Sequence, residues 1–163
     1  EDIPSGIYYV EKGYIKTYSI TPDGSENIYL IFQSGDIFPG HWQFIQKEEN
    51  KLYYETISPV VVHRKPKADF DTLIASDLQA AREIHAVMLH VVNTLAQRVE
   101  NLEHTNAYAR VLLHLLGLAI VFGNQKENEI AIRVPLTHYD FAHSINMRRE
   151  TASRELEKNK KKN

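Results

Sequence analysis

Side chains near the C-terminal end of the chain carry the chemistry of nucleic-acid recognition. Glu150 and Arg154 are four residues apart and Arg149 adjoins them, so a helix over residues 148–158 places all three on one side. A guanidinium can donate two hydrogen bonds to a guanine edge, and a carboxylate can accept one from the cytosine amino group. The sequence therefore predicts a helix that reads base edges in a DNA major groove, with Ser153 as a fourth base-facing residue.

A preceding short helix and a tight turn must position that face. Thr137 is a good N-cap, because its hydroxyl can accept a bond from a backbone N–H of the first turn, and Asp140 suits the positive end of the helix dipole. Asn146 tolerates the left-handed backbone that a tight turn requires. We expect an inward face of apolar residues, in which the small Ala142 allows a close approach: Phe141, Ala142 and Ile145.

The second helix needs an inward side of its own. Ala152 and Leu156 are four residues apart and are expected to face the core. Glu155 takes a position that is usually apolar in such helix pairs, so Leu156 must carry more of the packing. Residues better placed for phosphates, which fix register without carrying sequence information, are Thr137, Arg148 and Thr151.

Charge is distributed unevenly along the chain. Residues 137–163 hold seven Lys and Arg against four Asp and Glu, whereas residues 1–136 hold twelve against seventeen. A basic module on an acidic body fits attraction to DNA phosphates at one end of the chain. The alternative is an amphipathic C-terminal helix with ordinary solvated charge.

Length and composition exclude several classes of protein. A chain of 163 residues, 43% hydrophobic, can bury a core and form one or two small domains. Without cysteine it has no disulfide, thiol redox switch or cysteine-ligated iron–sulfur cluster. No apolar run approaches the roughly 20 residues of a membrane span, and the opening Glu1-Asp2 is unlike a signal peptide. We therefore expect a cytoplasmic protein without a membrane partner.

The N-terminal half reads as short strands. Residues 7–10, 14–20 and 27–32 are aromatic, β-branched or alternating, and the turn sequence at 21–24 joins the last two into a hairpin. Strand character resumes at residues 53–62, which Pro59 interrupts. This pattern predicts a small β-sandwich, barrel or roll.

Helical patterns follow the strands. A short helix is expected at residues 69–74 and a long one from Asp77. Apolar residues in the long helix recur at alternating spacings of four and three, which is the seam of a coiled coil and predicts a homodimer; a helix simply buried in its own domain is the alternative. The predicted dimer interface is Met88, Val92, Leu95, Val99 and Leu102, beside a second stripe of Ile84, Val87 and Val91.

An apolar helix and a strand lead into the helix pair. Residues 111–122 are apolar nearly all round, which predicts a buried helix that Gly123 ends. Residues 129–134 alternate as one strand, and Pro135 precedes the first helix of the pair.

This order of elements resembles the Crp–Fnr family of bacterial transcription regulators. The resemblance is carried by Leu136-Thr137, by the run 148–151 with Arg154, and by residues 8–13 followed by 35–38. It implies an α+β fold with an N-terminal double-stranded β-roll that senses a signal, a long dimerisation helix and a C-terminal winged-helix-type helix-turn-helix. The domains would span residues 1–76, 77–106 and 107–163. Two copies would read a two-fold symmetric site in double-stranded DNA, with RNA polymerase as a further partner.

The resemblance departs from the family at both ends and at the sensor. Members usually have more β-roll before residue 8 and a β-hairpin wing after the recognition helix, and the sequence as given has neither. The Arg-Ser pair that holds a cyclic phosphate in cyclic-AMP-binding members is missing, because the matching stretch is Glu49-Asn50-Lys51. Leu95 and Ala96 stand where hydroxyl residues would meet adenine, and Asp36 is a weak match to the ribose-binding acid. The effector is therefore unknown, and no cofactor is predicted.

Other chemistry finds less support in the sequence. The histidine pairs 85/90 and 138/143 are spaced poorly for one metal ion, and His41 and His63 could meet only through folding. No phosphate loop, nucleophile elbow or zinc-protease motif indicates an enzyme. The remaining alternatives are a cupin-like small-molecule or metal-binding protein, and a regulator with a degenerate sensor that acts constitutively or only as a dimeric module.

Overall fold

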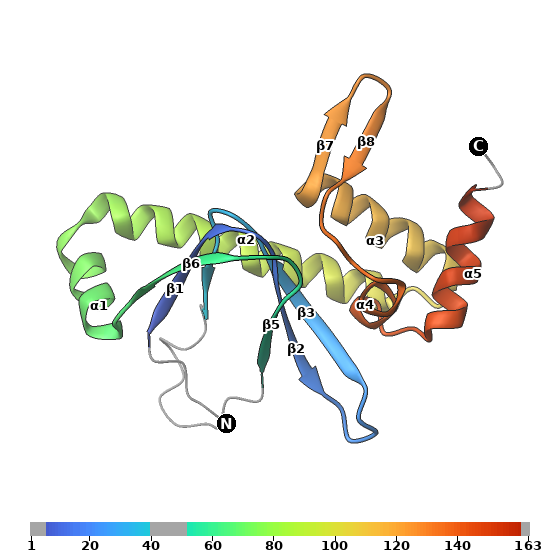
Figure 1. The fold of residues 1–163 in the computed structure, drawn as a ribbon, viewed down its shortest axis with the longest axis horizontal. Coiled ribbons are helices and arrows are strands. Elements are labelled where there is room, and N and C mark those ends of the chain that lie inside the picture. Colours follow the sequence, from blue (N-terminus) through green and yellow to red (C-terminus); the bar gives the residue numbers. More distant parts are fainter. Residues whose placement is uncertain (1–5, 40–51, 161–163) are drawn as a thin grey trace. The chain divides into compact units, whose positions relative to one another are not determined.

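A computed structural model describes residues 6–39 and 52–160 of the chain (Figure 1). The chain divides into two compact units. One comprises residues 1–19 and 29–94, and the other comprises residues 20–28 and 95–163. None of the described helices is both long and apolar enough to cross a membrane.

In the described part of the chain, the β-roll is built from six short strands, β1 to β6 (Figure 1). One antiparallel sheet has the order β4-β1-β6 and the other has the order β3-β2-β5. The first three strands fall where the alternating pattern predicted them, whereas the predicted stretch 53–62 divides into two strands, the second of which extends to Lys65. Pro59 lies between these two strands, where its missing N–H costs no ladder bond. Their bounds are Ile7–Lys12 (β1), Ile15–Ile20 (β2), Glu26–Phe32 (β3), Ile37–Phe38 (β4), Tyr53–Thr56 (β5) and Val61–Lys65 (β6).

The interior of the roll is packed with aromatic rings. Val10, Ile15, Phe32 and Phe38 form its buried cluster, and the Phe38 ring stacks on Tyr8 at 5.3 Å and on Tyr54 at 5.2 Å between centroids. Burial raises the pKa of the Tyr54 hydroxyl to about 12. The described strands therefore enclose a filled apolar core.

Two helices follow the strands: α1 (Lys67–Ser76) and α2 (Leu78–Glu103). Asp77 begins α2, because its carboxylate accepts bonds from the backbone N–H groups of Gln79 and Ala80 at 2.8 and 3.1 Å. A second buried cluster of Ile7, Ile37 and Phe70 packs against one side of α2, through Ile84, Val87 and Met88. Met88 was predicted in the dimer seam but lies against the core of the roll.

The second unit contains α3 (Ala107–Phe122), β7 (Gly123–Lys126), β8 (Glu129–Ile132), α4 (His138–Ser144) and α5 (Arg149–Lys160). Gly123 ends α3 as predicted, and no larger residue fits there. A Cβ would lie 2.0 Å from the Ala119 carbonyl oxygen and 2.5 Å from Ile130 Cγ2. The sequence predicted only one strand in this region, because the polar β7 carries no apolar alternation. Its backbone nevertheless pairs with β8 from Gly123–Ile132 to Lys126–Glu129. A hairpin thus precedes the helix pair.

The prediction that residues 111–122 form a buried helix is wrong for one flank of α3. Val111, Leu118 and Phe122 are buried, but Leu116 is 57% and Ile120 is 71% exposed. An apolar composition drives burial only where neighbours surround the helix. In the described part of the chain, α3 packs mainly on α5 and the β7–β8 hairpin, and one flank stays exposed.

Candidate nucleic-acid interface

Helix α4 begins at a capping box. Thr137 Oγ1 accepts a bond from the Asp140 backbone N–H at 3.1 Å, and Asp140 Oδ2 accepts one from the Thr137 N–H at 3.1 Å. The Thr137 hydroxyl also donates to Asp140 Oδ2 at 2.6 Å. The predicted N-cap is confirmed, and the capping box satisfies the backbone N–H groups of Thr137 and Asp140.

The turn after α4 uses the residue that the sequence singled out. Asn146 has φ of 50°, in the left-handed region that Asn tolerates better than most residues. The Met147 backbone N–H then returns to the Ala142 carbonyl at 2.9 Å, and an Arg110 guanidinium N–H donates to the Ile145 carbonyl at 3.3 Å. These bonds fix the direction in which the chain enters α5.

Small and apolar side chains bring the two helices together. Ala142 and Ala152 are fully buried, and Phe141 and Ile145 are buried beside them, as predicted. Polar groups also lie in this core. The Ser144 hydroxyl bonds His114 Nε2 at 2.6 Å, and the His114 ring meets the Phe141 ring edge-on at 4.9 Å. Burial, with a smaller contribution from the Arg98 charge, lowers the pKa of His114 to about 4.

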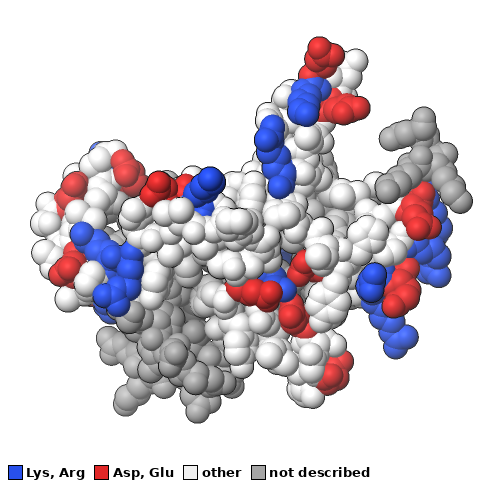
Figure 2. All heavy atoms as spheres, viewed as in Figure 1, with Lys and Arg blue, Asp and Glu red and all other residues white. Residues whose placement is uncertain are grey.

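The outer side of α5 presents the predicted base-reading residues. Arg148, Arg149 and Glu150 are exposed at its start. Arg154 is 67% exposed, and its Nε lies 3.4 Å from Glu155 Oε1 on the same helix. Figure 2 shows Lys and Arg side chains beside Asp and Glu side chains along this helix, so the surface is mixed rather than uniformly basic.

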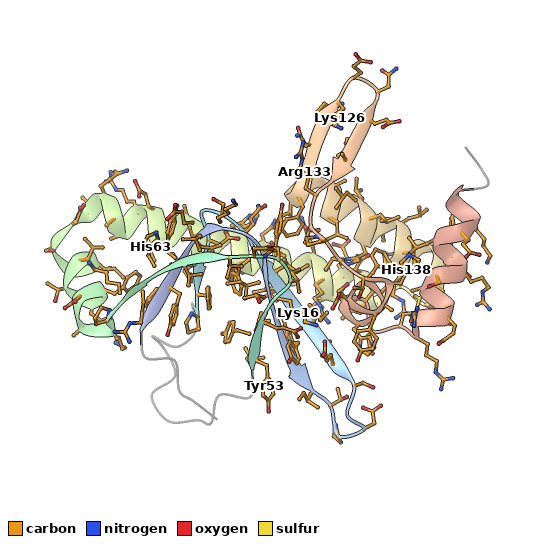
Figure 3. The ribbon with its side chains drawn as sticks, viewed as in Figure 1. Lys16, Tyr53, His63, Lys126, Arg133 and His138 are labelled. Carbon is orange, nitrogen blue, oxygen red and sulfur yellow. The ribbon has the colours of Figure 1, made fainter. Side chains whose placement is uncertain are left out.

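The three hydroxyl residues that were predicted to contact DNA lie in different environments. The Ser153 hydroxyl bonds Nδ1 of His138, which is labelled in Figure 3, at 2.9 Å, and this bond ties α5 to α4. The Thr137 hydroxyl is occupied by the capping box, and Thr151 is half-buried near the start of α5. Sequence reasoning missed His138 because a histidine at the start of a helix has no distinctive signal of its own.

The inward side of α5 differs from the prediction. Glu155 is only 4% exposed, whereas Leu156, expected to carry the packing, is half-buried. Both carboxylate oxygens of Glu155 accept bonds from Lys158 Nζ at 2.8 Å. The hydrogen bond from Lys158 lowers the pKa of the Glu155 carboxyl. Desolvation partly offsets this effect, and the Lys158 charge and the Arg154 contacts add to it. An ion-paired acid therefore takes the place of an apolar side chain.

The weakly matched sensor residue, Asp36, serves a turn. Its Oδ2 accepts a bond from the Gln33 backbone N–H at 2.7 Å, beside Gly35, whose φ of +97° favours glycine. Burial raises the pKa of the Asp36 carboxyl, partly offset by that bond and the His90 charge. The stretch 49–51, which lacks the Arg-Ser pair, and His41 lie outside the described residues.

Helix α2 exposes an apolar stripe. Leu89, Val92, Ala96 and Val99 are exposed, while Leu95 and Leu102 are half-buried. Val92 and Val99 therefore lie on the open side that the seam predicted. Leu89 and Ala96 continue this side in place of Met88 and Leu95.

The histidines do not form a metal site in the described ranges 6–39 and 52–160, where no three His, Asp or Glu side chains gather around one point. His63 instead pairs with Glu11 across neighbouring strands, and both side chains are largely exposed (Figure 3).

Comparisons with known proteins match both halves of the chain. The cyclic nucleotide-binding domain family matches residues 1–77, and the Crp-like helix-turn-helix domain family matches residues 108–163. Electron transport regulator A of Shewanella oneidensis is 24% identical over 152 residues, and the fumarate and nitrate reduction regulatory protein of Vibrio cholerae is 23% identical over 150. Each alignment covers 92% of this chain and only 59% of the relative.

A solved structure shares the fold. FixK2 from Bradyrhizobium japonicum superposes with a TM-score of 0.80 at 22% identity, over 99% of this chain and 78% of that one. The architecture is thus a cyclic nucleotide-binding-type roll followed by a Crp-like helix-turn-helix. The chain belongs to the Crp–Fnr family.

Proposed function

We propose that this chain is a homodimeric, sequence-specific DNA-binding transcription regulator. Arg149, Glu150 and Arg154 contact base edges, and Ser153 assists them while bonded to His138. Arg148 and Thr151 contact phosphates. Thr137 also contacts a phosphate, through the hydrogen-bonding capacity of its hydroxyl that the capping box does not use. The DNA is a two-fold symmetric duplex, and RNA polymerase is a second proposed partner.

One observation carries the proposal most directly. A capped helix, a left-handed Asn turn and a second helix with an exposed Arg-Glu-Arg face form one packed unit. Guanidinium and carboxylate groups on such a face match the donors and acceptors of the major groove. The Crp-like family match over residues 108–163 supports the same function.

Dimerisation supplies the second copy that a symmetric site needs. The exposed stripe of Leu89, Val92, Ala96 and Val99 repeats at spacings of three and four, as a coiled-coil seam does. A continuous helix that leaves such a stripe open gains stability by pairing with its twin. The proposed interface therefore keeps Val92 and Val99 at its centre, with Leu95 and Leu102 at its flank.

The roll is proposed to respond to a signal other than a cyclic nucleotide. The Asp36 carboxylate is bonded to its own turn, and the described core is filled with stacked rings. An effector would favour the arrangement of the two DNA-binding domains that fits DNA. The proposal does not specify the chemical class of the effector. The alternative is a regulator whose roll has no effector and which binds DNA constitutively; a metabolite screen for changes in DNA affinity would distinguish the two.

Removal of single guanidinium groups tests the proposed function. Arg149→Ala and Arg154→Ala are each expected to weaken binding to an operator, selected from random duplexes, by roughly 1–3 kcal/mol, because each loses a base contact. Fluorescence anisotropy on operator and scrambled duplexes measures the loss. Arg133→Ala, which removes the same charge from outside the helix pair, should leave discrimination unchanged. Operator binding that survives both changes on α5 would contradict the proposal.

A further inference from the structure

Apolar packing between the helices does not explain why the acidic residue Glu155 of α5 is buried. Ala152 and Glu155 are three residues apart and both are buried, so Glu155 belongs to the inward side of the helix. Carboxylates are rarely buried unless they are paired, because desolvation of the charge is costly. The pairing is therefore the feature to explain.

The partners of Glu155 include two cations of the outer flank. Lys158 Nζ lies 2.8 Å from both carboxylate oxygens, and the Arg154 Nε lies 3.4 Å from one of them. The two cationic side chains are 56% and 67% exposed, so their other surfaces face outward. A single inward anion thus contacts two side chains on the surface that is proposed to meet DNA.

The two contacts have different consequences for DNA binding. A guanidinium has five N–H donors, and a contact through Nε leaves the terminal fork able to bond a guanine edge. An ammonium bound by both carboxylate oxygens is held back from a phosphate, which it would otherwise neutralise without regard to sequence.

We propose that Glu155 is a positioning residue for DNA specificity, which restrains the Arg154 guanidinium for base contact and withholds the Lys158 ammonium from DNA phosphates. The inference rests on the proposed function, since it concerns how that same surface discriminates among sequences. It also accounts for an acid at a position where an apolar residue is usual.

The test compares Glu155→Gln with Glu157→Gln in the full chain. Glu157 is exposed on the same helix, so its variant makes the same charge change outside the pair of Glu155 and Lys158. Affinities for the selected operator and a scrambled duplex are measured over a series of salt concentrations. We expect Glu155→Gln to lower the operator-to-scrambled ratio by about tenfold, within the range of one base contact. Its salt slope should steepen by about 0.9, the value of one added phosphate contact.

Further variants separate the inference from folding defects and from the proposed function. Glu155→Leu places an apolar side chain on the inward side and should lose discrimination while its melting temperature is kept. Glu155→Gln combined with Lys158→Met should return the salt slope to that of the wild type. Equal ratios for the wild type and both Glu155 variants, or equal losses in the Glu155 and Glu157 variants, overturn the inference. A wild-type protein that does not discriminate operator from scrambled duplex overturns the proposed function instead.

Discussion

Polar residues in the core of the helix pair help to define a single arrangement of its helices. His114 and Ser144 join α3 to α4 through a 2.6 Å bond, and Asp140 is buried within its capping box. Buried polar groups of this kind are stable only when their partners are in place. The sequence marked Asp140 as a favourable charge at the start of the helix but gave no sign that His114 would face Ser144, because His114 and Ser144 are 30 residues apart.

The buried imidazole of His114 predicts a pH dependence of stability. Its pKa in the folded protein is about 4, below the ordinary 6.5, so the folded state binds fewer protons than the unfolded chain between these values. This contribution to stability is complete above pH 6.5 and is lost as the pH falls towards 4, by up to about 3 kcal/mol. Urea unfolding at a series of pH values measures it.

A matched pair of variants assigns that dependence. His114→Gln should flatten the stability profile across the window, whereas His104→Gln, at an exposed position near the end of α2, should not. A profile that His114→Gln leaves as steep as in the wild type would show that another group is responsible.

At the scale of elements, the helix pair follows from local signals. The cap, the left-handed turn residue and the small residues each determine the conformation of the few residues around them in the sequence. Helix α3 and strand β7 did not follow in this way. Their exposure and pairing depend on which neighbours the fold supplies, and periodicity within the element does not specify those neighbours.

The capping box predicts a measurable loss of stability in α4. Thr137→Val keeps the shape of the side chain but removes the hydroxyl that caps the helix, and it should lower the free energy of unfolding by about 1 kcal/mol. Chemical denaturation of the two proteins measures the difference. Thr105→Val, at an exposed position between α2 and α3, is the matched control and should change little. A variant at Thr137 as stable as the wild type would mean that Asp140 alone suffices for the cap.

At the scale of the whole molecule, function is proposed to require two copies. The apolar stripe on α2 is the described surface best suited to pair with its twin, because it runs along a helix of 26 residues. A dimer would supply the two recognition helices that the proposed two-fold symmetric DNA site requires.

A charge in the proposed seam should separate the two copies. Val99→Glu places a carboxylate within the stripe, where pairing would bury it without a partner, and sedimentation velocity should show a monomer at micromolar concentration. Gln97→Glu adds the same charge two residues away, on the outward side of the helix, and should remain dimeric. A dimeric Val99→Glu variant would place the interface elsewhere.

The sequence by itself determined the order of the elements apart from β7, together with the cap, the Asn turn and the outward Arg-Glu-Arg face of α5. These features depend on contacts within a few residues of one another, so local periodicity and residue type suffice to predict them. Only the tertiary structure decided that Met88 packs on the roll, that one flank of α3 is exposed, and that Glu155 is buried and paired with the exposed Lys158 and Arg154. Burial depends on which surfaces the fold brings together, and the spacing of residues along one helix does not contain that information.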